Sequence, residues 1–142
     1  TTSWFAAMDL PGATQLKHLK HLMLSRPFLT RIPDQSLLIS GSSKDLKRVQ
    51  LTRDGTPGKN DASYLMAYFP QHVEATIDTS RIAAALLHGW WFNPRDGTSK
   101  ALPSIAGEKS SNFSPPSGHE NEDWVLVLDD PSKGYPPPGM LD

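Results

Sequence analysis

The chain has 142 residues, no cysteine and a formal net charge of −1, from 14 lysine and arginine residues against 15 aspartate and glutamate residues. This length fits one domain with a real hydrophobic core and is too short for a complete (β/α)8 barrel, which needs about 250 residues. The absence of cysteine excludes disulfides and cysteine nucleophiles. The balanced charge argues against a nucleic-acid partner. No apolar run reaches the roughly 18 residues that cross a bilayer, so we expect no membrane partner.

One amphipathic helix is predicted near the start, over residues 10–25. Asp9 can serve as its N-cap, and Pro11 sits in the first turn, where a missing N–H costs nothing. The apolar residues then recur at spacings of three and four: Leu16, Leu19, Leu22 and Met23. Pro27 ends the pattern. No second helix is predicted downstream, so this stripe must lie on a sheet or on something that the chain lacks.

Short strands are predicted after residue 33. Apolar or alternating segments occur at roughly ten-residue spacing: 36–40, 47–53, 63–69, 73–77, 86–92 and 124–128. Turn residues such as Asp54-Gly55 and Asp96-Gly97 separate them. The pattern predicts a mainly β fold, an antiparallel β-sandwich preceded by one amphipathic helix. The polar segment 106–123 is predicted to be a long loop, and the proline-rich tail 130–142 to be extended.

Two strings repeat within the chain, Arg53-Asp54-Gly55-Thr56 and Arg95-Asp96-Gly97-Thr98. Each follows a predicted strand, so we interpret both as hairpin turns with the same Asp-Gly chemistry. A duplicated binding loop is the alternative.

No catalytic set stands out among the polar residues. The sequence contains no Gly-x-Ser-x-Gly elbow and no glycine-rich phosphate loop. Asp129 and Asp130 are adjacent at a predicted strand end and would point apart, so we expect a turn or cap role for them. A calcium site at this pair, or an enzyme that uses Asp123, Asp129 or Asp130, is the alternative. We therefore predict no catalytic residue, no metal ligand and no cofactor.

Aromatic residues are the candidate ligand-binding residues. Trp90 and Trp91 are neighbours in a predicted strand, so their rings face opposite sides of the sheet. One can fill the core, while the other can pack against an adjoining domain or stack on a sugar ring. Tyr64 and Tyr68, in another predicted strand, are further candidates for rings on a sheet face.

Several strings, in order along nearly the whole chain, resemble one family. They are Met8-Asp9-Leu10-Pro11-Gly12-Ala13, Ser25-Arg26-Pro27, Arg31-Ile32-Pro33-Asp34-Gln35-Ser36, Ala67-Tyr68-Phe69-Pro70, Trp90-Trp91-Phe92-Asn93-Pro94-Arg95-Asp96-Gly97, Phe113-Ser114-Pro115-Pro116 and Asp123-Trp124-Val125-Leu126-Val127-Leu128-Asp129-Asp130. Their order resembles the C-terminal region of the apiosidase-like glycoside hydrolases. The C-terminal module of that family carries the label "putative collagen-binding domain of a collagenase".

The resemblance implies a catalytic (β/α)8 barrel followed by a β-sandwich. Residues 1–33 would then be the C-terminal end of the barrel, one helix plus a linker, and residues 34–142 a β-sandwich accessory domain with a proline-rich tail. The barrel would be the partner of the helix stripe. Trp4 would resemble a residue of the final barrel loop near the substrate, which makes it a candidate ligand-binding residue. The catalytic carboxylates of the family lie on earlier barrel strands, so none is assigned here.

We therefore expect a non-catalytic C-terminal module of a secreted, extracellular glycoside hydrolase-like protein. Its expected partner is the N-terminal catalytic barrel of the same protein, on which it packs and which it stabilises, with polysaccharide or collagen as further expected ligands. The sequon Asn112-Phe113-Ser114 is compatible with secretion. The alternative is a stand-alone module that binds carbohydrate or collagen. Coplanar aromatic rings on an open face would favour that alternative.

Overall fold

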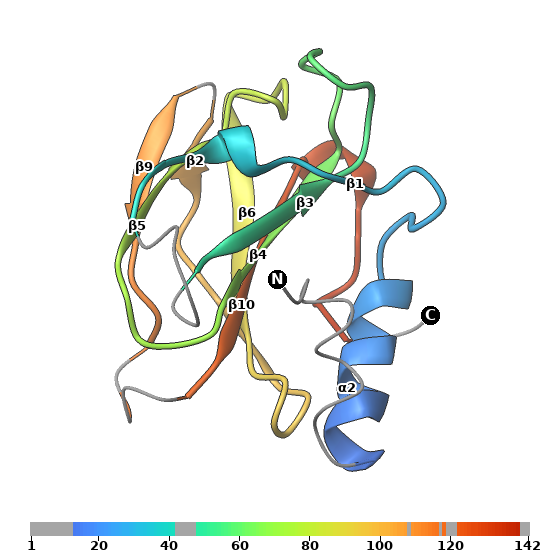
Figure 1. The fold of residues 1–142 in the computed structure, drawn as a ribbon. Helices are drawn as coiled ribbons and strands as arrows, with labels where there is room; N and C mark the ends of the chain where they lie inside the picture. Colours follow the sequence, from blue (N-terminus) through green and yellow to red (C-terminus); the bar gives the residue numbers. More distant parts are fainter. Residues whose placement is uncertain (1–12, 42–47, 108, 117, 119–121, 140–142) are drawn as a thin grey trace.

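The computed structural model describes residues 13–41, 48–107, 109–116, 118 and 122–139. In this part of the chain the fold is mainly β, as predicted, with two antiparallel sheets and the helix α2 (Ala13–Leu24) beside them (Figure 1). The predicted helix is confirmed over Ala13–Leu24 and ends one residue earlier than predicted, while residues 10–12 and the expected N-cap Asp9 lie outside the described residues.

The larger sheet has seven strands within the described ranges. They are β1 (Ile32–Pro33), β3 (Gln50–Arg53), β4 (Tyr64–Phe69), β6 (Leu86–Phe92), β7 (Ser99–Ala101), β8 (Ile105–Ala106) and β10 (Trp124–Asp129). Their order is β1-β3-β4-β10-β6-β7, and β8 pairs with the start of β6. The last strand of the chain, β10, is thus central: Leu126 pairs with Ala67 of β4 on one side and with Trp91 of β6 on the other.

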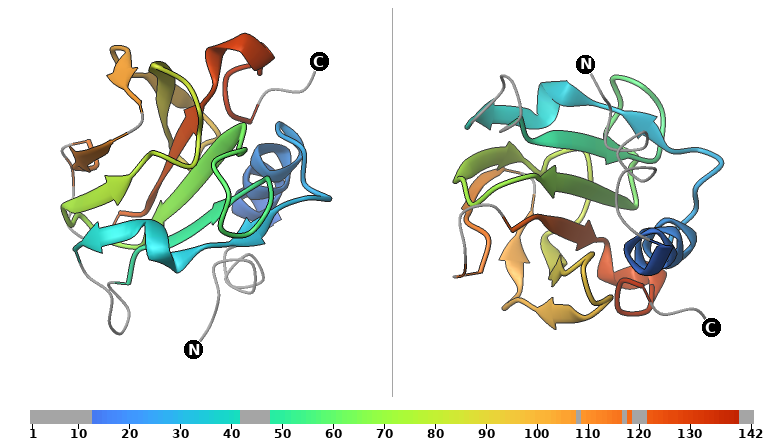
Figure 2. Two further views of the ribbon diagram at one scale, coloured as in Figure 1. Left: turned by 90° about the horizontal axis from the view of Figure 1, so that it is seen from above. Right: turned by 60° about the horizontal axis from the view of Figure 1, so that its bottom comes forward.

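The smaller sheet lies across one face of the larger one. Its strands are β2 (Leu38–Ser40), β5 (Ala75–Asp78) and β9 (Ser110–Phe113), with β5 in the middle. Two short 3-10 helices complete the fold, η1 (Gln35–Leu37) before β2 and η3 (Pro131–Lys133) after β10. Figure 2 shows the two sheets from two further directions.

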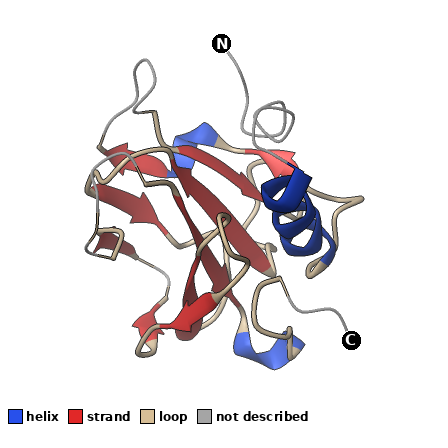
Figure 3. Cartoon of the chain, turned by 90° about the horizontal axis from the view of Figure 1, so that it is seen from below, coloured by secondary structure: helices blue, strands red, loops and turns tan. Residues whose placement is uncertain are grey.

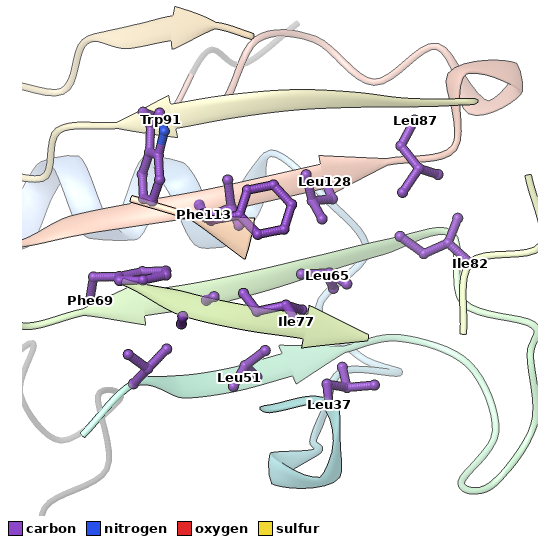
Figure 4. Packing of buried hydrophobic residues seen from close by; sticks show 14 of the residues in the cluster. Leu37, Leu51, Leu65, Phe69, Ile77, Ile82, Leu87, Trp91, Phe113 and Leu128 are labelled. Atoms are coloured by element: carbon purple, nitrogen blue, oxygen red, sulfur yellow. The ribbon is translucent and has the colours of Figure 1, made fainter. Parts of the chain in front are cut away.

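The main core lies between the two sheets (Figure 4). Alternation along β4 sends Leu65, Ala67 and Phe69 into this core, where they meet Ile77 and Phe113 of the smaller sheet. The other three residues of β4 point to the opposite, outer face. This face is also apolar, because the two central strands are buried along nearly their whole length.

The outer face of the larger sheet is covered by α2 (Figure 3). Leu19 and Leu22 pack there against a second cluster of buried residues: Tyr64, Met66, Phe92, Val125 and Val127. Of the two alternatives for this stripe, the structure shows the first, packing on a sheet, and the expectation that its partner is missing from the chain is wrong. The side chain of Leu16 lies outside the described residues.

All six predicted strands are present, β6 with the predicted ends and the other five with shifted ends, and four further strands of the described residues were not predicted. Residues 36–40 begin as η1 rather than as a strand, because the Asp34 carboxylate accepts from the Ser36 backbone N–H and caps a helical turn. The predicted loop 106–123 contains β9. Its polar sequence gives no strand signal, because only Phe113 of its four residues is buried. The strands β1, β7 and β8 have two or three residues each, too few to carry a periodic signal.

Removing a buried contact of α2 should destabilise the whole unit. We expect Leu22→Ala to lower the free energy of unfolding by about 2–5 kcal/mol, because Leu22 is fully buried against the sheet. Leu24→Ala, on the same helix but half-exposed, is the matched control and should change it by about 0.5 kcal/mol or less. Urea denaturation measures both. Equal effects of the two substitutions would contradict the docking of α2 on the sheet.

A second prediction concerns Asp34, which binds the buried Arg53. Burial raises the pKa of Asp34, but hydrogen bonds from Ser36 and the Arg53 guanidinium, 2.7 Å away, outweigh it and hold the pKa below 3.8. A lowered folded-state pKa adds stability above the unfolded value of about 3.9, and this stability is lost as pH falls through the folded pKa. We expect the Asp34→Asn variant to have a lower free energy of unfolding than the parent at pH 7, and this difference should narrow below about pH 4. Urea denaturation across this pH range measures the difference, and a difference that does not change with pH would contradict the assignment.

Candidate functional site

A buried ion pair joins the end of α2 to the central strand β10. Arg26 follows the helix, and its Nη2 lies 2.5 Å from Oδ2 of Asp129, while its Nε donates to Oδ1 at 3.1 Å. The two side chains are 0% and 3% exposed. This two-point geometry fixes direction as well as distance, which a lysine could not do.

Two aromatic residues complete the surroundings of this pair. The indole N–H of Trp90 donates to Asp129 Oδ2 at 3.3 Å, and the Arg26 guanidinium lies 5.4 Å from the centre of the Tyr135 ring. Burial raises the pKa of Asp129, and the neighbouring guanidinium opposes this shift by favouring the charged carboxylate. The cluster is thus a structural link between helix, sheet and tail.

A second arginine, Arg31, binds the connection between α2 and β1 on the side that faces the larger sheet. Arg31 Nε donates to the Tyr64 hydroxyl at 2.6 Å, and this hydroxyl donates to the Pro27 carbonyl at 2.6 Å. Arg31 Nη2 also donates to the Met23 carbonyl at 3.0 Å. Burial raises the pKa of Tyr64 to about 12 in spite of Arg31, so its phenol keeps the proton that it donates.

The opposite side of the same segment is apolar and exposed. Leu24, Phe28 and Leu29 are 42%, 50% and 89% exposed, and we call these three residues the junction surface. Residues 24–30 line a pocket of about 390 Å³ there. The segment 25–31 therefore has a polar underside bound to the sheet and an apolar upper side that faces solvent.

The two Asp-Gly strings lie in connections between paired strands, and only the second, at 95–98, contains turn residues. Asp54 is buried and accepts from the Ser63 N–H at 2.6 Å and from its hydroxyl at 2.5 Å, whereas Asp96 accepts from the Thr98 N–H at 2.9 Å. Gly55 and Gly97 have φ values of 92° and 77°, which glycine adopts without strain. Both aspartates thus bind partners within the protein.

The candidate aromatic residues do not form an open platform. Tyr64 is 0% exposed, and Trp91 is 4% exposed in the main core, edge-to-face with Phe69 at 5.2 Å. Their expected role in ligand stacking lacks an accessible ring face, because the larger sheet is covered on both faces. Tyr68 and Trp90 are half-buried on the outer face, and Tyr68 donates to Asp123 Oδ2 at 3.0 Å. Trp4 lies outside the described residues.

The late acidic residues have structural partners too. Asp123 Oδ1 lies 2.8 Å from Arg95 Nη1, and Asp130 caps η3 by accepting from the Ser132 N–H at 2.9 Å. Within the described ranges, no group of three or more histidine, aspartate or glutamate residues could hold a metal ion. No helix in this part of the chain is long and apolar enough to cross a membrane.

Sequence reasoning did not single out Arg26, Arg31 or the junction surface as functional. Arg26 and Asp129 are 103 residues apart, so no spacing rule connects them. The available signal was the pair Arg26-Pro27 next to an apolar Phe28-Leu29, a combination that is unusual for a solvated connection between elements.

Removing one charge of the buried pair should lower the free energy of unfolding strongly, whereas removing both charges should lower it much less. Arg26→Met leaves the Asp129 carboxylate buried without its partner, so we expect a loss of about 3–5 kcal/mol in the free energy of unfolding. Arg26→Met with Asp129→Leu should recover much of this loss. Arg95→Met, at a more exposed pair, is the control with an expected loss of about 1 kcal/mol or less. A double variant no more stable than the single one would contradict the assignment.

Solved structures of two glycoside hydrolases contain a part that is similar to this chain. One match is titled "Glycoside hydrolase", with a TM-score of 0.75 and 31% identity over 93% of this chain. Another is a glycoside hydrolase family 5 protein from Bacteroides vulgatus ATCC 8482, with a TM-score of 0.79 and 31% identity over 98% of this chain. This chain spans only 28% of the length of each. Among curated proteins, none matches the chain.

The model of one protein family matches residues 32–129, which run from β1 to the end of β10. The matched segment therefore contains every strand of both sheets that the structure describes, and it begins after α2. The resemblance inferred from the sequence strings is confirmed for this segment. The chain belongs to the family described as "Putative collagen-binding domain of a collagenase".

Proposed function

We propose that this chain is a non-catalytic accessory module of a secreted glycoside hydrolase, where it packs on the catalytic barrel of the same protein and stabilises it. One observation carries the proposal. Two solved glycoside hydrolases share this fold over 93% and 98% of the chain, yet the chain corresponds to only 28% of each. Most of each relative thus lies outside the shared module.

The state of the acidic side chains supports a role without catalysis. Glycoside hydrolysis requires two carboxyl groups about 5–10 Å apart across a cleft, one of them free to give and take a proton. Here Asp129 binds Arg26 in the interior, and Asp123 binds Arg95. Both carboxylates are bound to arginines, and neither faces a cleft in the described part of the chain. This arrangement is typical of structural ion pairs and not of a catalytic pair.

An extracellular location follows from the same proposal. Enzymes that degrade polysaccharides meet their substrates outside the cell, and the family description refers to collagen, an extracellular protein. The two half-buried outer-face rings, Tyr68 and Trp90, are the described candidates for contact with a glycan.

A stand-alone module that binds collagen or carbohydrate is the second candidate function. The family description favours collagen as its ligand. The burial of Tyr64 and Trp91 weakens the case for carbohydrate stacking, because two of the five candidate rings have no accessible face. Pull-down with fibrillar collagen and with insoluble polysaccharides distinguishes this function from the first.

The proposal is tested by the activity and the mass of the protein. We expect residues 1–142 alone to release no sugar from aryl glycosides or polysaccharides, because the carboxylates of Asp123 and Asp129 are bound to arginines. We expect the protein purified from its source to have an intact mass well above 15.6 kDa, or to remain bound to a larger partner. Turnover by the chain alone would overturn the non-catalytic assignment. A lone 15.6 kDa species that binds collagen or polysaccharide would favour the second function.

A further inference from the structure

We infer that the junction surface, formed by Leu24, Phe28 and Leu29, is the contact through which this module docks on the catalytic domain of the same polypeptide. The inference rests on the proposed function and adds to it a defined surface. The buried ion pair of Arg26 and Asp129 lies on the other side of the same connection between α2 and β1.

The first argument is the clustering of exposed apolar side chains. Five large hydrophobic residues are exposed in the described part of the chain: Leu24, Phe28, Leu29, Ile39 and Leu86. Single exposed apolar residues are ordinary on soluble proteins. Three of them within residues 24–29, around one pocket, form a contiguous patch, and such patches mark interaction sites.

The second argument is that hydrogen bonds and an ion pair fix the connection that carries this surface to the larger sheet. Arg26 is bound to Asp129, and the Pro27 carbonyl accepts from the Tyr64 hydroxyl, which Arg31 also binds. The Ser25 hydroxyl donates to the Leu22 carbonyl at 2.6 Å. A surface that is ordered before binding loses less conformational entropy when a partner arrives.

The third argument is the placement of charge. Both arginines of the segment, Arg26 and Arg31, direct their guanidinium groups toward the sheet, where each has a partner. Arg26 is the one charged residue that lines the pocket, and its guanidinium is bound to Asp129. The centres of protein interfaces are depleted of charged residues in the same way.

The position and size of the surface select the catalytic domain as its occupant. The junction surface lies immediately before residue 32, where the family match begins, and most of each solved relative lies outside the shared module. A stable contact between separate molecules buries about 800 Å² on each partner, which three side chains cannot supply. A domain on the same chain needs far less area, because tethering makes the contact intramolecular and raises the effective concentration of the partner.

Hydrogen–deuterium exchange tests the inference on the polypeptide purified from its source and on residues 1–142 alone. In the longer polypeptide, we expect the amides of residues 28–30 to exchange about tenfold or more slowly than in the module alone. Leu29→Asp in the longer polypeptide should remove this protection, because it places a charge in an apolar contact. Ile39→Asp, at a residue that is 57% exposed on β2, is the matched control and should leave the protection intact.

The remaining outcomes separate the inference from the proposed function. Protection of another surface of the module, with none at residues 28–30, would overturn the inference and leave the accessory function standing. No difference anywhere in the module would overturn both the surface and the packing of the module on a catalytic domain. Protection in residues 1–142 alone that grows with protein concentration would assign the surface to a second copy and overturn the inference. Because Leu29 is 89% exposed, the melting temperature of the Leu29→Asp module alone should match the parent, which excludes misfolding as the cause.

Discussion

The larger sheet is apolar on both faces, and this constraint shapes the rest of the molecule. Its central strands β4 and β10 are buried at nearly every position, so each face needs its own cover. The smaller sheet covers one face, and α2 covers the other. A sandwich of two sheets alone would expose Met66 and Val127 to water, each at a cost of about 1.5–3 kcal/mol. The helix is therefore part of the folded unit that the sheet requires.

Apolar burial holds α2 on the sheet but does not by itself define where along the sheet the helix lies, because the hydrophobic effect has no direction. The two-point contact between Arg26 and Asp129 supplies this direction at the C-terminal end of the helix. Desolvation of both charges offsets much of their attraction, so the pair contributes position more than stability. The Trp90 N–H and the Tyr135 ring lessen that desolvation by replacing some of the lost water contacts.

The sequence predicts the parts of this structure that depend on local pattern. The apolar spacing of Leu19 and Leu22 defined the helix, and the runs at β4, β6 and β10 defined the central sheet. The short polar strand β9 could not be predicted, because its identity depends on its pairing with β5 and not on its own residues. The rings of Tyr64 and Trp91 were placed in the right strands, but their burial depends on α2 and the smaller sheet as covers. The pair of Arg26 and Asp129 is a tertiary contact, so no local rule reveals it.

The family segment and the physical unit differ at their start, and this difference bears on how the module would act. The match begins at residue 32, whereas the described folded unit includes α2 and the connection 25–31. The connection from α2 to β1 is Ser25-Arg26-Pro27-Phe28-Leu29-Thr30-Arg31, and it is bonded to β4 and β10 on the side that faces the larger sheet. Any domain docked on its solvent-exposed side would share a rigid support with the larger sheet. Such a support can hold a neighbouring domain in one orientation, and this is what a stabilising accessory module must do.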